Sequence, residues 1–458
     1  MALEREPVLL ISLDRSVGGS LHEQLEAHLR ELVRSGNLPA GTKLPSSRAL
    51  ALQLGVSRGV VLEAYSQLSA EGYLAASQGA ATRVAAAASI ERPPVLASSF
   101  RARHAYDFDP ASPDLSAFPR DRWLRSLRAV LRQAPFEVVG EGDPRGVPEL
   151  RNELMSYLSR VRGAAPEPEH TLLTSGFTQG FAALCRVLRD RGVERVAVED
   201  PGWSQHRLIA ERIGLEPCPV AVDPLGIDVG ELARSGCEVV VITPAHQFPT
   251  GAVLSAERRA RLLEWAEDVD ALIVEDDYDS ELRYEREPVG ALQGLAPERV
   301  AYVGSVSKRL APALRIGWIL SPSWLTGALT YEQAVSDGGS PALDQLALSD
   351  FIARGELDRH LRRMRLHYRA RRQALLDALT QSLPRVKVSG VAAGLFAMVE
   401  VPGLRDEAAL VRAAAEREVN VEASRTAGGD TALVLGFANL STRAIADGIE
   451  RLAEALRA

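Results

Sequence analysis

Residues 304–317 read GSVSKRLAPALRIG, and this stretch decides how most of the chain is organised. It begins at the end of an apolar run of strand length. It places Lys308 beside the hydroxyls of Ser305 and Ser307, with Arg315 seven residues further on. A lysine forms an imine with an aldehyde when burial or nearby cations lower its pKa, and an arginine fork binds phosphate. A serine–lysine pair alone is common, so its meaning depends on the surrounding sequence.

Apolar runs of similar length recur on both sides of this stretch. They read RVAVED, EVVVITP, ALIVEDD, RVAYVGS and RIGWIL, at residues 195–200, 238–244, 271–277, 299–305 and 315–320. Helical stretches such as 255–267 separate the earlier runs. Strands that alternate with helices are typical of an α/β domain with a largely parallel sheet. The pattern from 350 to 458 is mostly helical with a few strands, which predicts a smaller lobe.

Two further motifs lie at probable strand ends, which is where open α/β sheets bind ligands. Residues 174–179, TSGFTQ, open a helix whose free backbone N–H groups suit a phosphate. Residues 199–203, EDPGW, place Trp203 after a strand. This indole either stacks on a flat ligand ring or packs as a half-buried side chain.

A third motif, EDDYD at 275–279, ends another probable strand. Asp276 at this position can keep a pyridinium nitrogen protonated, which makes the ring an electron sink. Tyr278 can hydrogen-bond an oxygen on the same ring. An acidic loop and a metal site are the alternatives, and the absence of a nearby histidine at ligand spacing disfavours the metal.

Residues 44–60, LPSSRALALQLGVSRGV, follow a different pattern. They predict two short helices joined by a turn at Gly55, with Ser57 as the N-cap of the second helix. A longer amphipathic helix precedes them, and residues 73–84 suit a small β-hairpin. This order predicts a winged helix-turn-helix, and a plain three-helix bundle capped by a hairpin shares the same periodicity.

In a winged helix-turn-helix, the N-terminus of the second short helix meets DNA, where small polar side chains contact phosphates and an arginine reaches a guanine edge. The expected DNA contacts are Ser57, Arg58 and Gly59 on that helix, Arg48 on the helix before it, and Gly79 and Thr82 at the wing.

Composition limits the remaining possibilities. The net charge of −7 argues against a generic nucleic-acid coat, so DNA binding must come from the placement of a few cations. No apolar run is long enough for a membrane span, and the N-terminus is charged where a secretory signal is apolar. Three cysteines without a CxxC pair indicate neither a disulfide framework nor a zinc site. We therefore expect a cytoplasmic protein without a metal.

These motifs together carry a family resemblance. Residues 20–84 resemble the winged helix-turn-helix of GntR-type bacterial regulators, in consecutive order and without gaps. Residues 106–458, including TPAHQFPTG at 243–251, resemble the fold-type I aminotransferases that use pyridoxal 5′-phosphate (PLP). The combination resembles the MocR subfamily of GntR regulators. It implies a DNA-binding domain at 1–85, a linker at 86–105 and a PLP-binding effector domain at 106–458.

The resemblance also implies a role for each motif residue. Lys308 is the implied Schiff-base lysine, Asp276 the partner of the pyridine nitrogen, and Tyr278 the partner of the ring oxygen. Trp203 is implied on the ring face. The residues implied around the phosphate are Ser175, Gly176, Phe177, Ser305, Ser307 and Arg315.

Several positions depart from the family pattern. Val434 stands where many aminotransferases carry the arginine that clamps a substrate carboxylate, and Arg425 in the preceding loop is the candidate substitute. Phe248 replaces a common asparagine. Glu141 replaces a tyrosine that reaches the phosphate across a dimer interface, and Leu62 replaces a DNA-contacting arginine of some relatives. These changes leave cofactor binding in place and disfavour efficient transamination.

The expected function is therefore a PLP-dependent transcriptional regulator. It would bind double-stranded operator DNA as a homodimer and sense PLP, a small amine or an amino acid through Lys308. An active aminotransferase with an N-terminal appendage is the alternative, favoured by the intact Lys308, Asp276 and Tyr278 set. A domain that senses PLP itself to control vitamin B6 supply is a third possibility, which Val434 favours because no carboxylate clamp is then needed.

Overall fold

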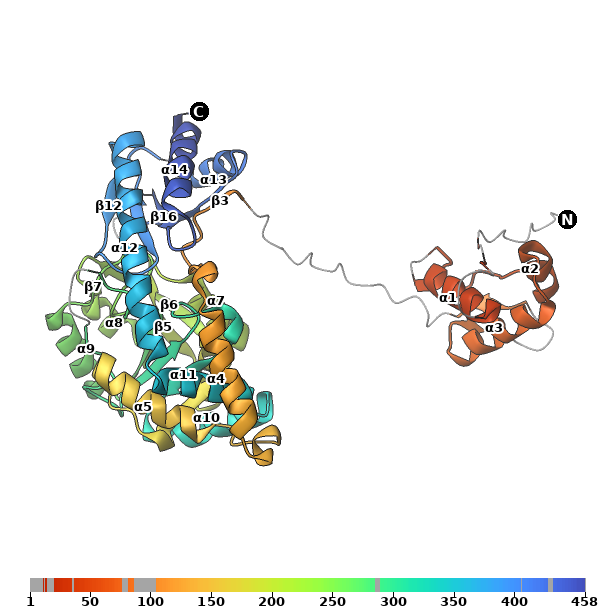
Figure 1. The fold of residues 1–458 in the computed structure, drawn as a ribbon, viewed down its shortest axis with the longest axis horizontal. Helices are drawn as coiled ribbons and strands as arrows, with labels where there is room; N and C mark the ends of the chain where they lie inside the picture. The colour runs from red at the N-terminus through yellow and green to blue at the C-terminus, as the bar shows by residue number, and fades with distance from the viewer. Residues whose placement is uncertain are drawn as a thin grey trace. The chain divides into compact units, whose positions relative to one another are not determined.

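The computed structural model describes residues 11, 13–14, 20–34, 37–75, 81–85, 104–284, 289–404, 406–426 and 431–457. The chain divides into two compact units, Met1–Ala102 and Arg103–Ala458 (Figure 1). The linker expected at 86–105 lies outside the described residues except for its last two positions. Within the described ranges, no helix combines the length and the apolar character that crossing a membrane requires.

Three helices form the N-terminal unit: α1 (Leu21–Arg34), α2 (Ser47–Leu54) and α3 (Arg58–Ala70). Each turns one apolar stripe inward, as the periodicity of the sequence predicts. The buried side chains on the three helices are Leu25, Leu29, Val33, Leu50, Ala51, Val61, Ala64, Tyr65 and Leu68.

The turn between α2 and α3 is defined by local hydrogen bonds. Ser46 caps α2, with its side chain accepting from the backbone N–H of Ala49 at 3.2 Å. Gly55 ends α2 in the left-handed region at φ 63°, which glycine adopts without a Cβ penalty. Ser57 caps α3 by accepting from Val60 N at 3.4 Å, so the predicted capping serine is confirmed.

The predicted hairpin is present as two short strands, β1 (Leu74–Ala75) and β2 (Arg83–Val84). They pair antiparallel, with Leu74 opposite Val84. Both of these side chains are buried against the helices. The tip of the hairpin, including Gly79, lies outside the described residues.

The larger unit is built on an eight-stranded sheet in the order β4-β11-β10-β9-β8-β5-β6-β7. Strands β11 and β7 run antiparallel to their neighbours, and the central strands β10, β9, β8, β5 and β6 are parallel. The largely parallel α/β sheet expected from the sequence is thus confirmed. The strands are β4 (Thr171–Thr174), β5 (Arg195–Asp200), β6 (Glu216–Asp223), β7 (Gly226–Ile227), β8 (Val239–Ile242), β9 (Leu272–Asp277), β10 (Val300–Ser305) and β11 (Gly317–Leu320).

Helices cover both faces of this sheet, because alternate side chains of a strand point to opposite faces. On β8, Val239 and Val241 belong to the cluster with α6 and α10, whereas Val240 and Ile242 belong to the cluster with α8 and α9. The helices are α4 (Arg120–Gln133), α5 (Pro148–Arg162), α6 (Phe177–Asp190), α7 (Ser204–Ile213), α8 (Val229–Ser235), α9 (Ala256–Asp268), α10 (Ser323–Ser336) and α11 (Ala342–Ala353).

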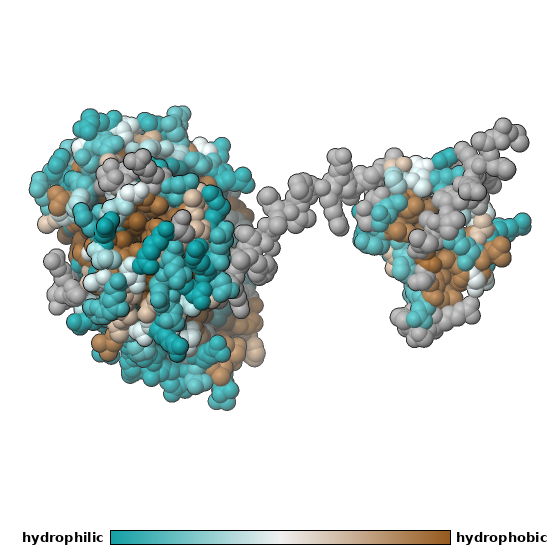
Figure 2. Space-filling view, turned by 90° about the horizontal axis from the view of Figure 1, so that it is seen from above, coloured by the Kyte–Doolittle hydropathy of each residue, from teal (hydrophilic) through white to brown (hydrophobic). Residues whose placement is uncertain are grey.

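The C-terminal lobe adds a four-stranded sheet in the order β12-β13-β16-β15. The long helix α12 extends from α11 to this lobe and packs against α14 (Figure 1). Hydrophilic side chains cover most of the face of the larger unit that Figure 2 shows, with apolar areas between them. The elements are α12 (Glu356–Ser382), β12 (Lys387–Ser389), β13 (Phe396–Glu400), α13 (Glu407–Ala415), β14 (Val419–Asn420), β15 (Glu422–Arg425), β16 (Thr431–Gly436) and α14 (Thr442–Arg457), with β3 (Tyr106–Asp107) pairing with β14.

Candidate functional site

A cavity of about 220 Å³ lies at the carboxyl ends of the parallel strands. Eight of the ten residues that the sequence predicts for a cofactor site line it, and Ser175 and Gly176 do not. The full lining is Pro110, Ala111, Phe177, Thr178, Trp203, Thr243, Phe248, Asp276, Tyr278, Ser305, Ser307, Lys308, Pro312, Arg315, Leu395 and Phe396.

Lys308 enters this cavity from the loop that follows β10. Its Nζ donates a hydrogen bond to the carbonyl oxygen of Ala111. Burial lowers the pKa of Lys308, and the nearby carboxylates Asp109, Asp279 and Asp276 oppose that shift. A lower pKa increases the fraction of neutral amine, which is the nucleophilic form.

Asp276, at the end of β9, is held by a histidine from α7. His206 Nε2 lies 3.0 Å from Asp276 Oδ2, and both side chains are buried. Burial raises the pKa of Asp276, and the hydrogen bond from His206 opposes the shift. The Asp276 carboxylate is therefore held in position by His206 and offers a buried hydrogen-bond acceptor in the wall of the cavity.

The opposite end of the cavity is positively polarised. Helix α6 begins after Gly176, which has φ 95°, and its first turn has no side-chain cap. A Cβ on Gly176 would lie 3.6 Å from the Arg315 guanidinium, so these two groups are neighbours. Uncapped N–H groups beside a guanidinium form an anion site. Ser175 lies just outside the cavity, with its Oγ 3.1 Å from Ser340 Oγ.

Aromatic side chains wall the space between these two ends. The rings of Phe177 and Trp203 pack edge to face at 5.5 Å, and Trp203 packs in the same way against His206 at 5.2 Å. On the other side, Phe248 meets Phe396 edge to face at 5.0 Å. The cavity therefore offers apolar faces suited to a flat ring.

Tyr278 lines the cavity and is hydrogen-bonded to His246, which forms a buried pair with Asp279. Its hydroxyl donates to the carbonyl oxygen of His246 at 2.7 Å, and His246 Nδ1 lies 2.8 Å from Asp279 Oδ2. Burial raises the pKa of Tyr278 well above its usual value. The tyrosine is thus a neutral phenol whose oxygen can still accept or share a hydrogen bond in the cavity.

A buried ion-pair network supports the lysine loop from behind. Arg309, next to Lys308, pairs with Glu281 at 2.8 Å, and Arg162 pairs with Asp277 at 2.7 Å. Burial alone raises the pKa of the Asp277 carboxyl, but Arg162 and Arg309 together lower it well below its usual range. Breaking one partner of such a buried set leaves an uncompensated charge, which costs about 3–5 kcal/mol.

These side chains fit PLP. The cavity supplies an amine at Lys308, a buried carboxylate at Asp276, a phenol at Tyr278, and an anion site at Arg315 and the start of α6. PLP needs one of each for its aldehyde, ring nitrogen, ring oxygen and phosphate.

The departures from the enzyme pattern occupy defined places. Val434 is fully buried in β16, between β13 and β15. The prediction that Arg425 lies in a loop and replaces the clamp is wrong: it ends β15 and does not line the cavity. Its side chain is 69% exposed and pairs with Glu407 at 3.6 Å. Glu141 is exposed in the loop before α5. Arg315 is therefore the one arginine among the residues that line the cavity.

The candidate DNA-contacting face surrounds the start of α3. Ser57, Arg58, Gly59 and Arg48 are exposed, and Arg58 Nε donates to Ser47 Oγ at 3.2 Å. Residues 37–62 carry three cations and no carboxylate, which concentrates positive charge on the turn. Thr82 is half-buried, and its carbonyl oxygen accepts from Leu44 N.

Sequence reasoning missed two supporting residues of the cavity. His206 lies three residues after Trp203, about one helical turn, and this spacing could have predicted that both side chains face the same site. Thr243 lines the cavity and donates from Oγ1 to the buried Glu199 at 2.6 Å, and burial raises the pKa of Glu199 to about 7 against this hydrogen bond. No local pattern predicts the contact between Thr243 and Glu199, because the two residues are 44 positions apart and come together only through the pairing of β8 with β5.

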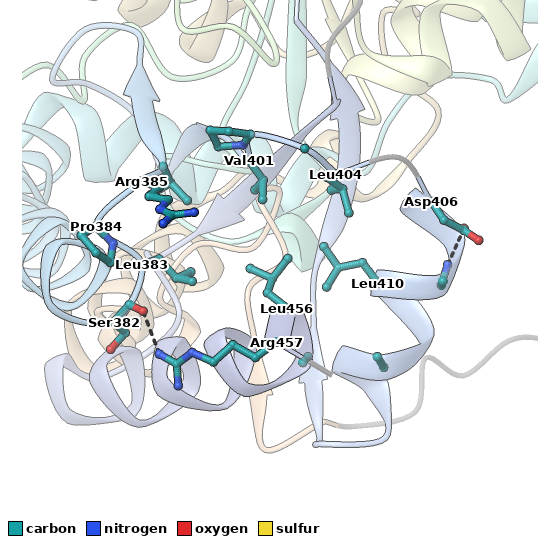
Figure 3. A pocket seen from close by; sticks show the side chains of 16 residues that line it. Ser382, Leu383, Pro384, Arg385, Val401, Leu404, Asp406, Leu410, Leu456 and Arg457 are labelled. Atoms are coloured by element: carbon teal, nitrogen blue, oxygen red, sulfur yellow. Dashed lines mark hydrogen bonds between the residues drawn. The ribbon is translucent and has the colours of Figure 1, made fainter.

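A wider hollow of about 630 Å³ lies in the C-terminal lobe and contains none of the predicted residues. Val401, Leu410 and Leu456 project into it, and Arg457 donates to the carbonyl oxygen of Ser382 at 3.1 Å (Figure 3). Its walls are mostly apolar.

Comparisons with known proteins identify a family for each of the two units. Residues 123–452 match the family described as aminotransferase class I and II, and residues 21–84 match the bacterial regulatory proteins of the gntR family. The structure superposes on the kynurenine aminotransferase of Pyrococcus horikoshii with a TM-score of 0.71 and 25% identity, covering 78% of this chain and 91% of that one.

Two regulators resemble the chain over nearly its full length. The HTH-type pyridoxine biosynthesis transcriptional regulator PdxR of Corynebacterium glutamicum is 33% identical over 437 residues, 94% of each chain. The probable rhizopine catabolism regulatory protein MocR of Rhizobium meliloti is 33% identical over 479 residues, 98% of this chain and 96% of that one.

The fold and the site define a DNA-binding transcriptional regulator with an aminotransferase-like domain of fold type I. Within that class, the chain belongs to the MocR-type members of the GntR family. The resemblance expected from the sequence is thus confirmed.

Proposed function

We propose that this regulator holds PLP covalently at Lys308 and changes its affinity for operator DNA in response to PLP or to a small amine or amino acid. The observation that carries the proposal is the cavity that brings Lys308, Asp276, Tyr278 and Arg315 together. PLP supplies an aldehyde and an electron-sink ring when bound. Lys308 provides the amine, Asp276 holds a proton at the ring nitrogen, and Arg315 with the start of α6 binds the phosphate.

PLP itself is the effector that the lining favours. Arg315 is the one arginine in the lining, so an amino acid would find no second guanidinium for its carboxylate. The name of the PdxR relative links that protein to pyridoxine biosynthesis. The name of the MocR relative links that protein to rhizopine catabolism, which keeps an amine or amino acid as the second candidate.

The test is the dependence of DNA binding on the effector. Operator duplexes would be selected from a random-sequence pool with the full chain, and binding would be measured with and without PLP, and then with a panel of amines and amino acids. The proposal requires that one of these ligands changes the dissociation constant, because a ligand shifts an equilibrium only through differential affinity. A constant affinity under all of these conditions would refute it.

We propose that Arg58 and Arg48 contact the operator. Replacing Arg58 by alanine should weaken binding by about 1–3 kcal/mol if it reads a base, and by a similar amount on all sequences if it meets only phosphate. Gel-shift titrations of selected and scrambled duplexes measure both cases. Arg30→Ala is the matched control, because it removes a cation that pairs with Glu71 away from the turn. Unchanged binding by both the Arg58 and Arg48 variants would contradict the placement.

We also propose a cytoplasmic homodimer formed through the larger unit. Successive apolar side chains on α4 and on the short helix η3 (Phe136–Val139) are exposed: Leu124, Leu131, Phe136 and Val139. Phe136 is 93% exposed, which is unusual for a large aromatic residue away from an interface.

Phe136→Glu is therefore expected to weaken dimerisation, because the interface would have to bury an unpaired charge. Sedimentation velocity at micromolar concentration with PLP present measures the change. Leu295→Glu, at a leucine that is 65% exposed elsewhere on the unit, serves as the control. A monomeric wild-type protein, or equal effects of both variants, would count against this interface.

A further inference from the structure

A second polar hollow of about 540 Å³ lies apart from the cofactor cavity and shares no lining residue with it. It lies between the C-terminal end of α5 and the N-terminal half of α12. Its charged lining consists of four arginines and two carboxylates: Arg160, Arg162, Arg362, Arg365, Asp358 and Glu281. We propose that this hollow is a site for a phosphate group, separate from the cofactor site.

Arg162 lies at the base of the positive charge in this hollow. Its side chain is fully buried, with Nε donating to Asp277 Oδ2 at 2.7 Å and Nη1 donating to the carbonyl oxygen of Val289. Its Nη2 has no hydrogen-bond partner among the described residues. This nitrogen is itself buried, and the buried carboxyl of Glu275 also interacts with the guanidinium. Arg162 therefore fixes a positive charge in the wall of the hollow.

The carboxylates of the hollow are already engaged elsewhere. Glu281 receives Nε and Nη2 of Arg309 at 2.8 Å, and Asp358 receives Arg160 Nη2 at 2.8 Å. Arg362 and Arg365 form no ion pair with any described residue. The lining therefore holds a surplus of two positive charges, which matches a phosphate dianion.

Helix geometry accounts for only part of this cluster. Arg160 and Arg162 lie in the last turn of α5, where cations complement the helix dipole. Arg362 and Arg365 lie in the N-terminal half of α12, where the dipole does not favour cations. They are three residues apart and share a helix face with Asp358 and Leu361, which also line the hollow. Both arginines therefore line the same wall of the hollow.

The site is linked to the cofactor cavity by shared partners. Asp277 pairs with Arg162 and Arg309 and is the neighbour of Asp276, while Arg309 is the neighbour of Lys308. An anion in the hollow attracts the Arg162 guanidinium that Asp277 also holds. Phosphate in the hollow is therefore expected to weaken the pairing of Arg162 with Asp277, which helps to hold the loop that carries Lys308.

The test uses the full chain with PLP supplied and inorganic phosphate as the probe, titrated by calorimetry in phosphate-free and sulfate-free buffer. The Arg362→Ala/Arg365→Ala double variant is expected to bind phosphate about tenfold more weakly, or not at all. The Arg369→Ala/Arg372→Ala double variant is the matched control, because it removes two arginines of the same helix that do not line the hollow. Thermal melting of each variant verifies folding.

An Arg315→Ala variant separates this site from the cofactor site. It is expected to bind phosphate as the wild type does, and loss of binding in this variant alone would assign the phosphate to the cofactor cavity and overturn the proposal. Equal affinities of the two double variants would overturn it as well.

A second arm identifies the source of the phosphate group, which is either a small phosphate compound or the DNA backbone. Binding to a random 30-base-pair duplex is measured as a function of salt. Each phosphate contact contributes about 0.9 to the slope of log affinity against log salt, so a DNA contact predicts a shallower slope in the Arg362→Ala/Arg365→Ala variant than in its control. Equal slopes, together with the loss of inorganic phosphate binding, assign the site to a small phosphate compound.

Discussion

Lys308→Ala is expected to abolish the covalent attachment of PLP and the visible absorbance band that accompanies it. Lys308 supplies the only amine among the residues that line the cavity. Burial lowers the pKa of this amine, so a larger fraction is neutral and able to attack the aldehyde near neutral pH, with water as the leaving molecule. Absorbance spectra and intact mass after borohydride reduction measure the effect.

The chain contains three lysines, Lys43, Lys308 and Lys387, so few side chains compete with Lys308 for the label. Peptide mapping of the reduced wild type should place the label on Lys308. Lys387→Ala is the matched control, at an exposed lysine of the same unit, and should retain the full band. A label on Lys43 or Lys387, or no attachment at saturating PLP, would refute the assignment.

Multiple-turnover transamination is expected to be far slower than the rate of about 1 per second or faster that is usual for enzymes. Val434 is buried where the carboxylate-clamping arginine of many aminotransferases stands, and Arg425 pairs with Glu407 outside the cavity. A substrate without a bidentate anchor samples many poses, so it loses the orientation that proton transfer requires. Exchange of an amine at Lys308 needs no such anchor and should still be visible in the absorbance spectrum.

The measurement is a screen of common amino acids with a 2-oxo acid acceptor, and product is followed over many equivalents of protein. Any residual rate should disappear in Lys308→Ala if it arises in this cavity. Sustained turnover at enzymatic rates in the wild type, absent from Lys308→Ala, would instead promote the aminotransferase alternative.

Much of the fold followed from local patterns. The cap at Ser57, the αL glycine at Gly55 and the buried stripe of α3 depend on residues within one or two turns of each other. The strand ends at Asp276 and Ser305 followed from short apolar runs, and parallel pairing of β9 and β10 brings them to the same sheet edge. The grouping of Lys308 with Asp276 could therefore be predicted.

The support of the site could not be predicted, because it joins residues that are distant in the chain. Asp276 meets His206 across 70 positions, and Arg162 meets Asp277 across 115. No periodicity encodes such contacts. They depend on the strand order, in which β5 lies beside β8 and β8 beside β9, and on where each crossover helix returns.

Sequence by itself determined the two kinds of domain, the residues with the chemistry, and their positions at helix starts and strand ends, because spacing and capping act within a few residues. Tertiary structure alone decided that Arg425 pairs with Glu407 away from the cavity, that Ser175 turns toward Ser340, and that Arg162 keeps a buried donor beside a basic hollow. These outcomes depend on packing between separate elements, where the cost of burying a charge or a polar group selects its partner.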